Sequence, residues 1–332
     1  MKLAVIEGDG IGKEVISSAV KVLDALSLPI EKVPLEVGLR KWEKCGVAIT
    51  DEDMETIKEC DCILFGAVTT PPDPDYKSVL LTIRKELDMY ANVRPIKPLA
   101  GITGITGRND FDFVIVRENT EGMYSGIEEL HDDVSYTTRV ITRKGSKRIA
   151  EYACKLAKTR KKNLTIVLKS NVLKSDKLFL DVCRDTARYE DIDYKDMLVD
   201  SMAYSLICSP QKYDVIVTTN LFGDILSDMS AALVGSLGLV PSANIGEKHA
   251  FFEPVHGSAP DIAMKGIANP IAAVLSLKMM LEWHDDTEEA KIVEDAVNHV
   301  LTQKIRTPDI NGSARTKDIE YALVDYVRKQ LA

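Results

Sequence analysis

The segment NLFGDILSD, residues 220–228, follows an apolar strand-like run at 215–217 and leads into a glycine-rich turn. A helix that begins near Gly223 would place Asp224 and Asp228 four residues apart on one face. Two carboxylates at this spacing repel each other unless a cation lies between them, and such hard oxygen ligands suit Mg²⁺ or Mn²⁺. A bare Asp-x-x-x-Asp is more often a solvated acidic face, so the two interpretations are separated by the residues around it.

Composition narrows the class of protein. The chain has 332 residues, enough for one large domain or two of moderate size. The start MKLAVI reads directly into a strand, from which we expect no signal or transit segment, and no apolar run approaches the roughly 18 residues of a membrane span. The net charge of −9 argues against a nucleic-acid partner. The six cysteines are scattered without a CxxC pair, which predicts reduced thiols and a cytoplasmic location.

Short apolar runs alternate with amphipathic ones, which predicts an α/β fold. The predicted strands are 3–6, 62–65, 113–116, 164–168, 197–199 and 215–217. The predicted helices are 12–26, 51–59, 79–90, 146–158, 173–187, 224–234, 270–283, 287–303 and 317–329. The turn GDGIG, at 8–12, has its third glycine one residue too early for a dinucleotide-binding Rossmann turn, although it could line a cleft.

Polar side chains gather where several predicted strands end, the place where open α/β sheets build their sites. They form a coherent set for an anionic, metal-chelating substrate, because arginine forks bind carboxylates while lysine and tyrosine move protons. Arg117, Tyr124, Lys169 and Asp200 lie in segments that follow predicted strands, and Asp224 and Asp228 follow the run at 215–217. Arg84 and Arg94, which bracket residues 87–93, complete the set. Singly, each has a plainer alternative, such as a surface ion pair for Arg84 or Arg94 and a core phenol for Tyr124.

Taken together, several motifs make the chain resemble the β-decarboxylating dehydrogenases: isocitrate, 3-isopropylmalate, homoisocitrate and tartrate dehydrogenases. The motifs are GDGIG (8–12), residues 87–95 between two arginines, RENTEGMYSG (117–126), KSNVLK (169–174), NLFGDILSD (220–228) and FEPVHGSAPD (252–261). The resemblance covers essentially the whole chain and is strongest to the archaeal homoisocitrate and 3-isopropylmalate enzymes.

The resemblance implies an α/β, two-lobed fold with a mixed central sheet, which is not a Rossmann fold. A large cofactor-binding lobe would comprise residues 1–90 and 236–332. A small lobe, 91–235, would carry the dimer interface and an arm near 126–142. The active cleft would lie between the lobes and be completed by the second subunit of a homodimer, with a dimer of dimers left open.

The same resemblance assigns roles to the polar set. The residues implied are Arg84, Arg94 and Arg117 for the carboxylates of a di- or tricarboxylate substrate, Asp224, Asp228 and the partner subunit's Asp200 for Mg²⁺ or Mn²⁺, the partner subunit's Lys169 for deprotonation of the C2 hydroxyl, and Tyr124 for protonation of C3. Oxidation at C2 gives a β-keto acid, whose decarboxylation a divalent ion assists by polarising the new carbonyl.

Residues 256–261 resemble the adenosine-binding loop of the family. The implied cofactor residues are His256, Gly257, Ser258, Ala259, Pro260 and Asp261, with Asn269 near the adenine. The carboxylate of Asp261 can accept hydrogen bonds from free ribose hydroxyls but would repel a 2′-phosphate. NADP-using relatives carry lysine and tyrosine where Asp261 and Ile262 stand, so NAD is the expected cofactor. The alternative for Asp261 is a helix N-cap or turn residue.

The segment before Arg84 bears on the substrate. Lys77, Leu80, Leu81 and Arg84 have the spacing i, i+3, i+4 and i+7, which predicts a shared helix face. Isopropylmalate enzymes place two leucines at 80 and 81 and a glutamate at 77, whereas isocitrate enzymes have a serine at the position of Ser78 and an asparagine at that of Leu80.

This mixture leaves the substrate open between two candidates. Lys77 and Ser78 could hold a distal carboxylate while the leucines pack along methylenes, which favours homoisocitrate and longer homologues. The segment Tyr76, Lys77, Ser78 also resembles that of archaeal homoisocitrate enzymes, although bacterial ones carry an arginine at the position of Leu81. A Lys77 that points to solvent would favour 3-isopropylmalate, the substrate in leucine biosynthesis. A non-catalytic regulatory paralogue is the third hypothesis, although such subunits usually lose a catalytic residue.

Overall fold

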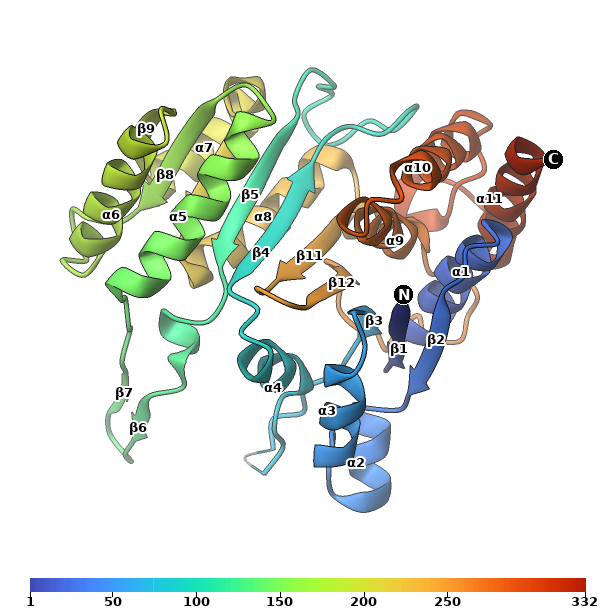
Figure 1. Ribbon diagram of the computed structural model, residues 1–332, viewed down its shortest axis with the longest axis horizontal. Coiled ribbons are helices and arrows are strands. Elements are labelled where there is room, and N and C mark those ends of the chain that lie inside the picture. The colour runs from blue at the N-terminus through green and yellow to red at the C-terminus, as the bar shows by residue number, and fades with distance from the viewer. Residues whose placement is uncertain (74) are drawn as a thin grey trace.

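The computed structural model describes residues 1–73 and 75–332 as strands and helices built around one large sheet (Figure 1). The strands of this sheet are β1 (Lys2–Gly8), β2 (Glu31–Leu35), β3 (Cys62–Ala67), β4 (Ala91–Ile96), β5 (Phe113–Glu118), β8 (Asn163–Leu168), β9 (Asp193–Leu198), β10 (Val215–Thr218), β11 (Pro241–Ile245) and β12 (Ala250–Pro254). The helices are α1 (Gly12–Ala25), α2 (Leu39–Cys45), α3 (Asp51–Lys58), α4 (Val79–Glu86), α5 (Arg143–Lys158), α6 (Asp176–Tyr189), α7 (Val199–Cys208), α8 (Asn220–Val234), α9 (Ile271–Trp283), α10 (Thr287–Thr302) and α11 (Thr316–Leu331).

The sheet is mixed. Its strand order is β2-β1-β3-β12-β11-β4-β5-β10-β8-β9. The central strand β11 runs antiparallel to both β12 and β4, and β4 runs antiparallel to β5. The outer neighbours on either side pair in parallel. The predicted α/β class with a mixed central sheet is therefore confirmed, and the antiparallel centre separates this fold from the parallel Rossmann sheet.

Both faces of the sheet are buried. Successive side chains of a strand point to opposite faces, so neighbouring residues of β1 and of β3 belong to two different cores. Leu3 of β1 and Leu64 of β3 belong to the core that also contains the apolar sides of α1 and α9. Ala4 and Phe65, one residue further along the same strands, belong to a second core with residues of α3 and α4. This burial explains why the runs that were predicted as strands are continuously apolar.

The strands from the chain ends and those from the chain middle occupy different halves of the sheet. The half formed by β2, β1, β3, β12 and β11 comes from residues 2–67 and 241–254, and the other half from 91–218 (Figure 1). The two halves meet where β11 pairs with β4, with Ala243 opposite Val93. This segregation runs in the same sense as the predicted lobes, whose boundaries near 90 and 236 stay a prediction.

A two-stranded hairpin projects from the body of the molecule (Figure 1). It consists of β6 (Glu128–Leu130) and β7 (Ser135–Thr137), paired antiparallel. Its apolar side chains are exposed, Leu130 by 78% and Tyr136 by 56%. The hairpin lies within the range 126–142 where an arm was predicted.

Several predicted element boundaries were wrong, including the three that follow. The helix predicted over 79–90 ends at Glu86, because Asp88 has a φ of 45° and the chain then enters β4. The helix of the NLFGDILSD segment begins at Asn220 and not near Gly223. The strand predicted over 197–199 ends at Leu198, where α7 begins.

Several elements were absent from the predictions: β2, β4, β6, β7, β11, β12, α2 and α7. The reason is clearest for β11, whose sequence PSANI is too polar to read as a buried strand. Its Ser242 and Asn244 are fully buried and accept hydrogen bonds from the Asn92 side chain at 2.9 Å each. Hydrogen bonds to a neighbouring strand offset the free-energy cost of burying these polar side chains.

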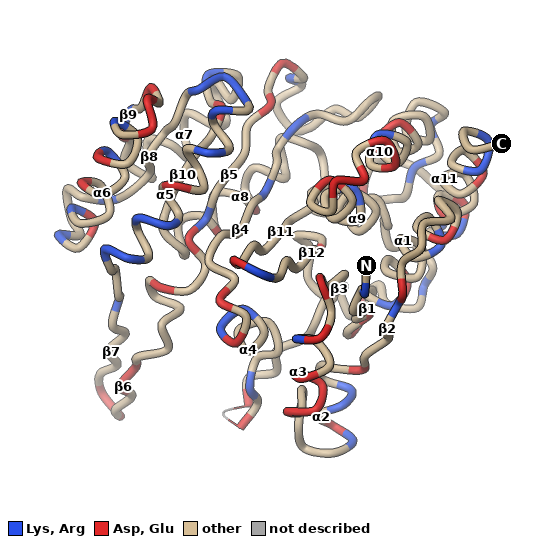
Figure 2. The backbone as a smooth tube through the Cα atoms, viewed as in Figure 1, with Lys and Arg blue, Asp and Glu red and all other residues tan. Residues whose placement is uncertain are grey.

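Charged residues of both signs are distributed over both halves of the sheet (Figure 2). All six cysteines are free, and burial raises the pKa of the Cys62 thiol to about 12. Across residues 1–73 and 75–332, none of the helices has the length and apolar character of a membrane span.

Candidate active site

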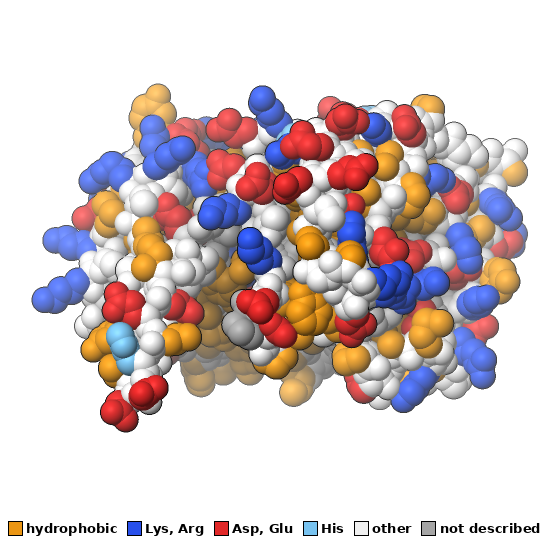
Figure 3. Space-filling view, turned by 90° about the horizontal axis from the view of Figure 1, so that it is seen from below, with side chains coloured by type: hydrophobic (Ala, Val, Ile, Leu, Met, Phe, Trp, Pro, Cys, Tyr) orange, Lys and Arg blue, Asp and Glu red, His pale blue; other side chains and the backbone are white. Residues whose placement is uncertain are grey.

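Three buried arginines from three different elements line one cavity of about 220 Å³. Arg84 lies on α4, Arg94 on β4 and Arg117 on β5. The complete lining is Gly66, Ala67, Val68, Leu80, Arg84, Arg94, Arg117, Tyr124, Asp224, Glu253, Pro254, Val255, His256 and Gly257. Seen from the side of α4 and the arm, the molecular surface is hollowed between the two (Figure 3). Guanidinium groups withdrawn from water need partners or an anionic ligand.

Helix α8 lies close against β5 because Gly223 has no side chain. A Cβ at Gly223 would meet Arg117 Cγ at 2.6 Å. Asn220, in the first turn of α8, accepts hydrogen bonds from Arg117 Nε at 3.0 Å and from Nη2 at 2.7 Å. The start of α8 therefore holds the Arg117 guanidinium in place and presents Asp224 one turn further along.

Arg117 and Asp224 form an ion pair. Arg117 Nη1 donates a hydrogen bond to Asp224 Oδ1. Burial, together with the neighbouring Arg94, lowers the pKa of Arg117 to about 10, so the guanidinium stays charged at neutral pH. Burial alone would raise the pKa of Asp224, but the Arg117 and Arg94 guanidinium groups bring it below its ordinary value. Asp224 is consequently a carboxylate at neutral pH.

Arg94 contacts the second carboxylate of α8. Its Nη1 donates to Asp228 Oδ1 at 3.0 Å and to Ser227 Oγ at 2.5 Å, and it lies 3.6 Å from Asp224 Oδ1. Burial raises the pKa of Asp228, and the neighbouring Asp224 adds to this, although Arg94 opposes it. The arginines lower the pKa of both carboxylates, but at Asp228 burial and the charge of Asp224 outweigh them, so the two pKa values are shifted in opposite directions.

Donor groups without acceptors remain around the cavity. Arg84 Nη2 donates to Glu253 Oε1 at 2.8 Å, and both side chains are buried. Arg84 Nε and Arg94 Nε are buried and, among residues 1–73 and 75–332, have no hydrogen-bond partner. An unsatisfied buried donor is costly, so these N–H groups favour a bound carboxylate that would accept from them.

Tyr124 lies at the rim of the cavity, 36% exposed. Its hydroxyl donates to Asp224 Oδ2 at 2.9 Å, and the Arg117 guanidinium lies 5.3 Å from its ring centroid. Burial and the negative charge of Asp224 raise the pKa of the phenol. At neutral pH the phenol therefore carries a proton that it can donate.

Asp224 and Asp228 have the donor chemistry of a Mg²⁺ or Mn²⁺ site, which is oxygen only. Within the described part of this single chain, no third acidic, histidine or cysteine side chain joins them in a group that could hold a metal. Asp200 and Lys169, the other residues of the predicted set, do not line the cavity. They contact each other instead: Lys169 Nζ donates to Asp200 Oδ1 at 2.5 Å, which lowers the pKa of Asp200.

The shared helix face predicted for Lys77 and Arg84 was wrong. Helix α4 begins at Val79, after Ser78, whose Oγ accepts from Leu81 N at 3.4 Å, so Lys77 precedes the helix. Leu80 lines the arginine cavity, whereas Leu81 is 43% exposed and does not line it.

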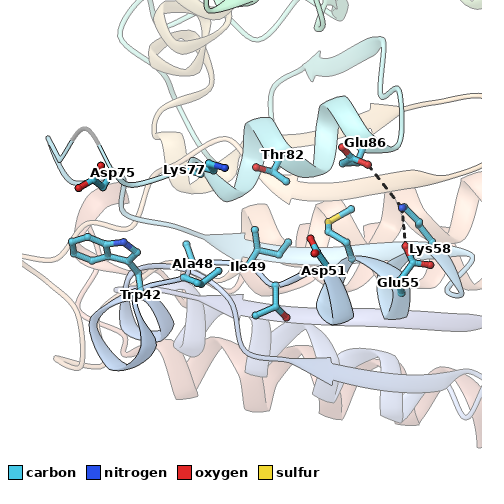
Figure 4. Close-up of a pocket in the computed structure, with 14 residues that line it drawn as sticks. Trp42, Ala48, Ile49, Asp51, Glu55, Lys58, Asp75, Lys77, Thr82 and Glu86 are labelled. Atoms are coloured by element: carbon cyan, nitrogen blue, oxygen red, sulfur yellow. Dashed lines mark hydrogen bonds and ion pairs between the residues drawn. The ribbon is translucent and has the colours of Figure 1, made fainter.

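Lys77 lines a different, larger cavity of about 660 Å³ between α4 and the α2–α3 segment. Figure 4 shows Lys77, Thr82 and Glu86 facing Trp42 and residues of α3 across this space. In this structure Lys77 therefore lies apart from the residues that line the arginine cavity, and its role in binding substrate stays a prediction.

The predicted cofactor loop follows β12 and packs on the GDGIG turn. Ile11 N donates to Ser258 O at 2.9 Å, and a Cβ at Gly10, where φ is 56°, would lie 1.9 Å from that oxygen. Only glycine permits this approach. His256 Nε2 is buried without a partner among the described residues, and burial lowers the pKa of His256.

Other residues of the loop leave polar groups available or use them locally. Asp261 is exposed and Gly257 has open space where a Cβ would be. Asn269 Nδ2 donates to Asp309 Oδ2 at 3.1 Å, and Asn269 Oδ1 accepts from Ile271 N at 3.1 Å. A buried imidazole nitrogen without a partner in the described part of the chain, a glycine with open space beside it and an exposed carboxylate are compatible with a nucleoside ligand.

Two residues that hold the cavity's arginines, Glu253 in its lining and Asn220 behind Arg117, were missed by the sequence analysis. Glu253 supports Arg84 and also accepts from Asn244 Nδ2 at 2.8 Å, and Asn220 holds Arg117. Both stand inside the motifs FEPVHGSAPD and NLFGDILSD, which was the available signal. Their roles depend on which arginine folds against them, and spacing along the chain does not contain that information.

Comparison with known proteins gives concordant results. Residues 2–323 match the family described as isocitrate/isopropylmalate dehydrogenase. The chain is 48% identical to homoisocitrate dehydrogenase of Methanocaldococcus jannaschii, over 100% of this chain and 99% of that protein. It is 46% identical to the 3-isopropylmalate/3-methylmalate dehydrogenase of the same organism, over 99% of each. The crystal structure of isocitrate dehydrogenase from Methylococcus capsulatus superposes with a TM-score of 0.94 at 41% identity, covering 98% of this chain and 99% of that one.

Proposed function

The chain belongs to the isocitrate/isopropylmalate dehydrogenase family and is a decarboxylating dehydrogenase, and from this premise we propose that it oxidises and decarboxylates a 3-substituted malate with NAD⁺ and Mg²⁺ or Mn²⁺. The observation that carries the proposal is the cavity in which Arg84, Arg94 and Arg117 are buried together beside the carboxylates of Asp224 and Asp228. Two of the arginines have an Nε without a hydrogen-bond partner among the described residues. Such a cavity is complementary to a molecule with several carboxylates.

In the proposed reaction the arginines bind and orient the malate carboxylates by paired N–H donors. Lys169 of the partner subunit takes the proton of the C2 hydroxyl, and a bound NAD⁺ would supply the acceptor for the C2 hydride. The bond between C3 and its carboxylate then breaks and releases CO₂, and the Tyr124 hydroxyl delivers a proton to C3. A divalent ion held by Asp224, Asp228 and the partner subunit's Asp200 would supply Lewis-acid polarisation of the C2 oxygen.

We propose homoisocitrate as the preferred substrate, on the similarity to the Methanocaldococcus jannaschii enzyme of that name. A specific observation favours 3-isopropylmalate as the alternative: Leu80 lines the arginine cavity, whereas Lys77 lines another one. An apolar wall beside the arginines suits an alkyl substituent.

Substrate choice is tested by comparing kcat/KM for homoisocitrate, 3-isopropylmalate and isocitrate on one preparation, with NADH formation as the readout. Turnover should require added Mg²⁺ or Mn²⁺, and undiminished activity in EDTA would contradict the metal assignment. Absence of turnover with all three acids would favour the non-catalytic alternative. In a Lys77→Glu variant, homoisocitrate turnover should fall relative to that of 3-isopropylmalate, and unchanged selectivity would remove Lys77 from substrate recognition.

The preference for NAD over NADP is proposed from Asp261, which is exposed on the cofactor loop. A carboxylate there accepts from ribose hydroxyls and repels a 2′-phosphate, so Asp261→Ser should narrow the difference in KM between NAD⁺ and NADP⁺. An unaltered ratio would indicate that Asp261 acts only as a turn residue.

We also propose a cytoplasmic location, which the six free cysteines support.

We further propose a homodimer with shared active sites. Exposed apolar side chains on the arm and on α7 and α8 support a self-complementary interface, among them Leu130, Tyr136, Tyr204 and Ile225. Mixing the inactive variants Lys169→Ala and Tyr124→Phe tests this directly. A hybrid dimer would contain one intact site, with Tyr124 from one protomer and Lys169 from its partner, so activity should return on mixing. No recovery in a mixture shown to contain hybrids would contradict shared sites.

A further inference from the structure

A fully buried carboxylate holds the backbone from which Lys169 projects. Asp176, the first residue of α6, has no solvent exposure. Its Oδ2 accepts a hydrogen bond from Lys169 N at 2.6 Å. The segment between them, 170–175, is mostly exposed, and Val172 is 65% exposed. Asp176 therefore pins the start of an otherwise exposed loop to the body of the protein.

Arg139 connects this carboxylate to the start of α8. Its Nη2 lies 2.6 Å from Asp176 Oδ1, in an ion pair whose side chains are 11% and 0% exposed. Its Nη1 donates to Ser175 Oγ at 2.8 Å and its Nη2 to Thr219 Oγ1 at 3.2 Å. Thr219 immediately precedes α8, the helix that carries Asp224 and Asp228.

We propose that Asp176, with Arg139, is a positioning residue for Lys169: it sets the point from which the side-chain amino group of the lysine reaches the reacting hydroxyl. The proposal rests on the proposed function, in which Lys169 moves the C2 proton. A lysine side chain is long and flexible, so the position of its nitrogen depends on where its backbone is held. An error of about 1 Å at a proton-transfer group is enough to lower the rate on the order of 100-fold.

The substitution Asp176→Asn tests the proposal with little change in volume. Both neighbours of the carboxylate present N–H groups: Lys169 N–H donates to Oδ2, and the Arg139 guanidinium forms an ion pair with Oδ1. An asparagine amide has one acceptor oxygen and one NH₂ group, so one of the two donors must face the NH₂. The contact with Lys169 or the contact with Arg139 is lost in either orientation.

The chain offers a matched control in Asp214. This carboxylate is 2% exposed, accepts from Arg160 Nε at 2.8 Å and accepts from Lys161 N at 2.9 Å. It precedes β10, whereas Thr219 follows it, so Asp214 lies at the opposite end of that strand. Asp214→Asn therefore removes an equivalent buried pair at a distance from the predicted site.

Both variants should lose thermal stability, but only Asp176→Asn should lose chemistry. We expect its kcat to fall about 10- to 100-fold while the KM for the malate stays within about threefold of wild type. The deuterium isotope effect on kcat with C2-deuterated substrate should rise, because a misplaced base makes the oxidation step more rate-limiting. Asp214→Asn should keep wild-type values of all three parameters. A kcat for Asp176→Asn equal to that of Asp214→Asn, with an unchanged isotope effect, would overturn the proposal.

Two further variants separate the inference from the function beneath it. Lys169→Ala should abolish turnover. If it does not, the proposed role of Lys169 fails, and the proposed positioning role of Asp176 fails as well. If Lys169→Ala is inactive and Asp176→Asn is fully active, only the positioning role fails. Arg139→Gln serves where Asp176→Asn does not fold, because it keeps the acceptor for Lys169 N–H and weakens only its support. It should lower kcat less than Asp176→Asn would and raise the isotope effect in the same direction, and wild-type kinetics would contradict the proposal.

Discussion

The two faces of α4 border cavities of different character. On one side Leu80 and Arg84 line about 220 Å³ together with two other buried arginines. On the other side Thr82 and Glu86 line about 660 Å³. In the larger cavity one lysine is held by two glutamates, since Lys58 Nζ lies 3.0 Å from Glu55 and 3.9 Å from Glu86 (Figure 4).

The smaller cavity differs because its arginines keep buried N–H groups without acceptors among the described residues. Free energy of binding is available where donors have lost water and lack a partner, and volume alone does not supply it. The site is therefore assigned to the smaller cavity. Variants on either side of α4 can break this assignment or sharpen it.

The largest effect is expected for Arg117→Gln, at the most buried of the three arginines. The change removes the ion pair with Asp224 and the hydrogen bonds to Asn220. Truncating one partner of a buried charge pair costs roughly 2–5 kcal/mol, on the order of 30- to 3,000-fold in kcat/KM. Steady-state kinetics at saturating NAD⁺ and Mg²⁺ measure it. Arg108→Gln, at an exposed pair with Asp110, is the control, and an equal loss there would point to a general effect of arginine removal.

Arg84→Gln compared with Glu86→Gln tests the two faces of α4 directly. Arg84 is buried and loses its contact with Glu253, so kcat/KM should fall on the order of 10- to 100-fold. Glu86 is exposed on the other cavity, and its substitution should change kcat/KM by no more than about twofold. Kinetics on the same substrate decide. A larger loss for Glu86→Gln would move the site to the other face.

A smaller difference is expected between two adjacent leucines. Leu80 lines the arginine cavity and Leu81 does not, so truncation to alanine should matter only at Leu80. Loss of contact with a substrate methylene or methyl group is worth about 1–3 kcal/mol in kcat/KM. Comparing Leu80→Ala and Leu81→Ala with an alkyl-substituted malate measures it. Equal values for the two variants would mean that this side of α4 does not contact the substituent.

The smallest effects concern stability in the metal-free protein. The pKa of Asp224 is lowered, so its ionised form stabilises the fold at neutral pH, and this contribution is lost as the pH falls through the lowered pKa of the folded state. The pKa of Asp228 is raised, so its ionised form is unfavourable at neutral pH. Asp224→Asn should lower the Tm at pH 7 in EDTA, and Asp228→Asn should raise it. At these partly exposed positions, each substitution should change the free energy of unfolding by less than about 1 kcal/mol. Shifts of the same sign would contradict the opposed environments of the two carboxylates.

The sequence was sufficient to predict the elements whose buried residues form apolar runs or recur with helical periodicity. Continuous apolar runs predicted the strands β1, β3, β5, β8 and β10, because both faces of the sheet are covered. Periodic apolar runs predicted the long helices. Polar strands such as β11 were not recognisable, since their partners lie on other strands. The family and the mixed sheet followed from motifs, while the exact start of α4 depended on the cap formed by Ser78.

For the site, residue types and spacing were enough to name three arginines, a tyrosine and two aspartates, because binding an anionic, metal-chelating molecule requires groups of those kinds. Which charges neutralise which depended on tertiary packing. Gly223 lets Arg117 lie against α8, Glu253 meets Arg84 across the cavity, and Lys77 falls outside it. The sequence determines which chemical groups are present and how they are spaced. The pairing of buried charges depends on distances between segments far apart in sequence, and only the folded sheet determines these distances.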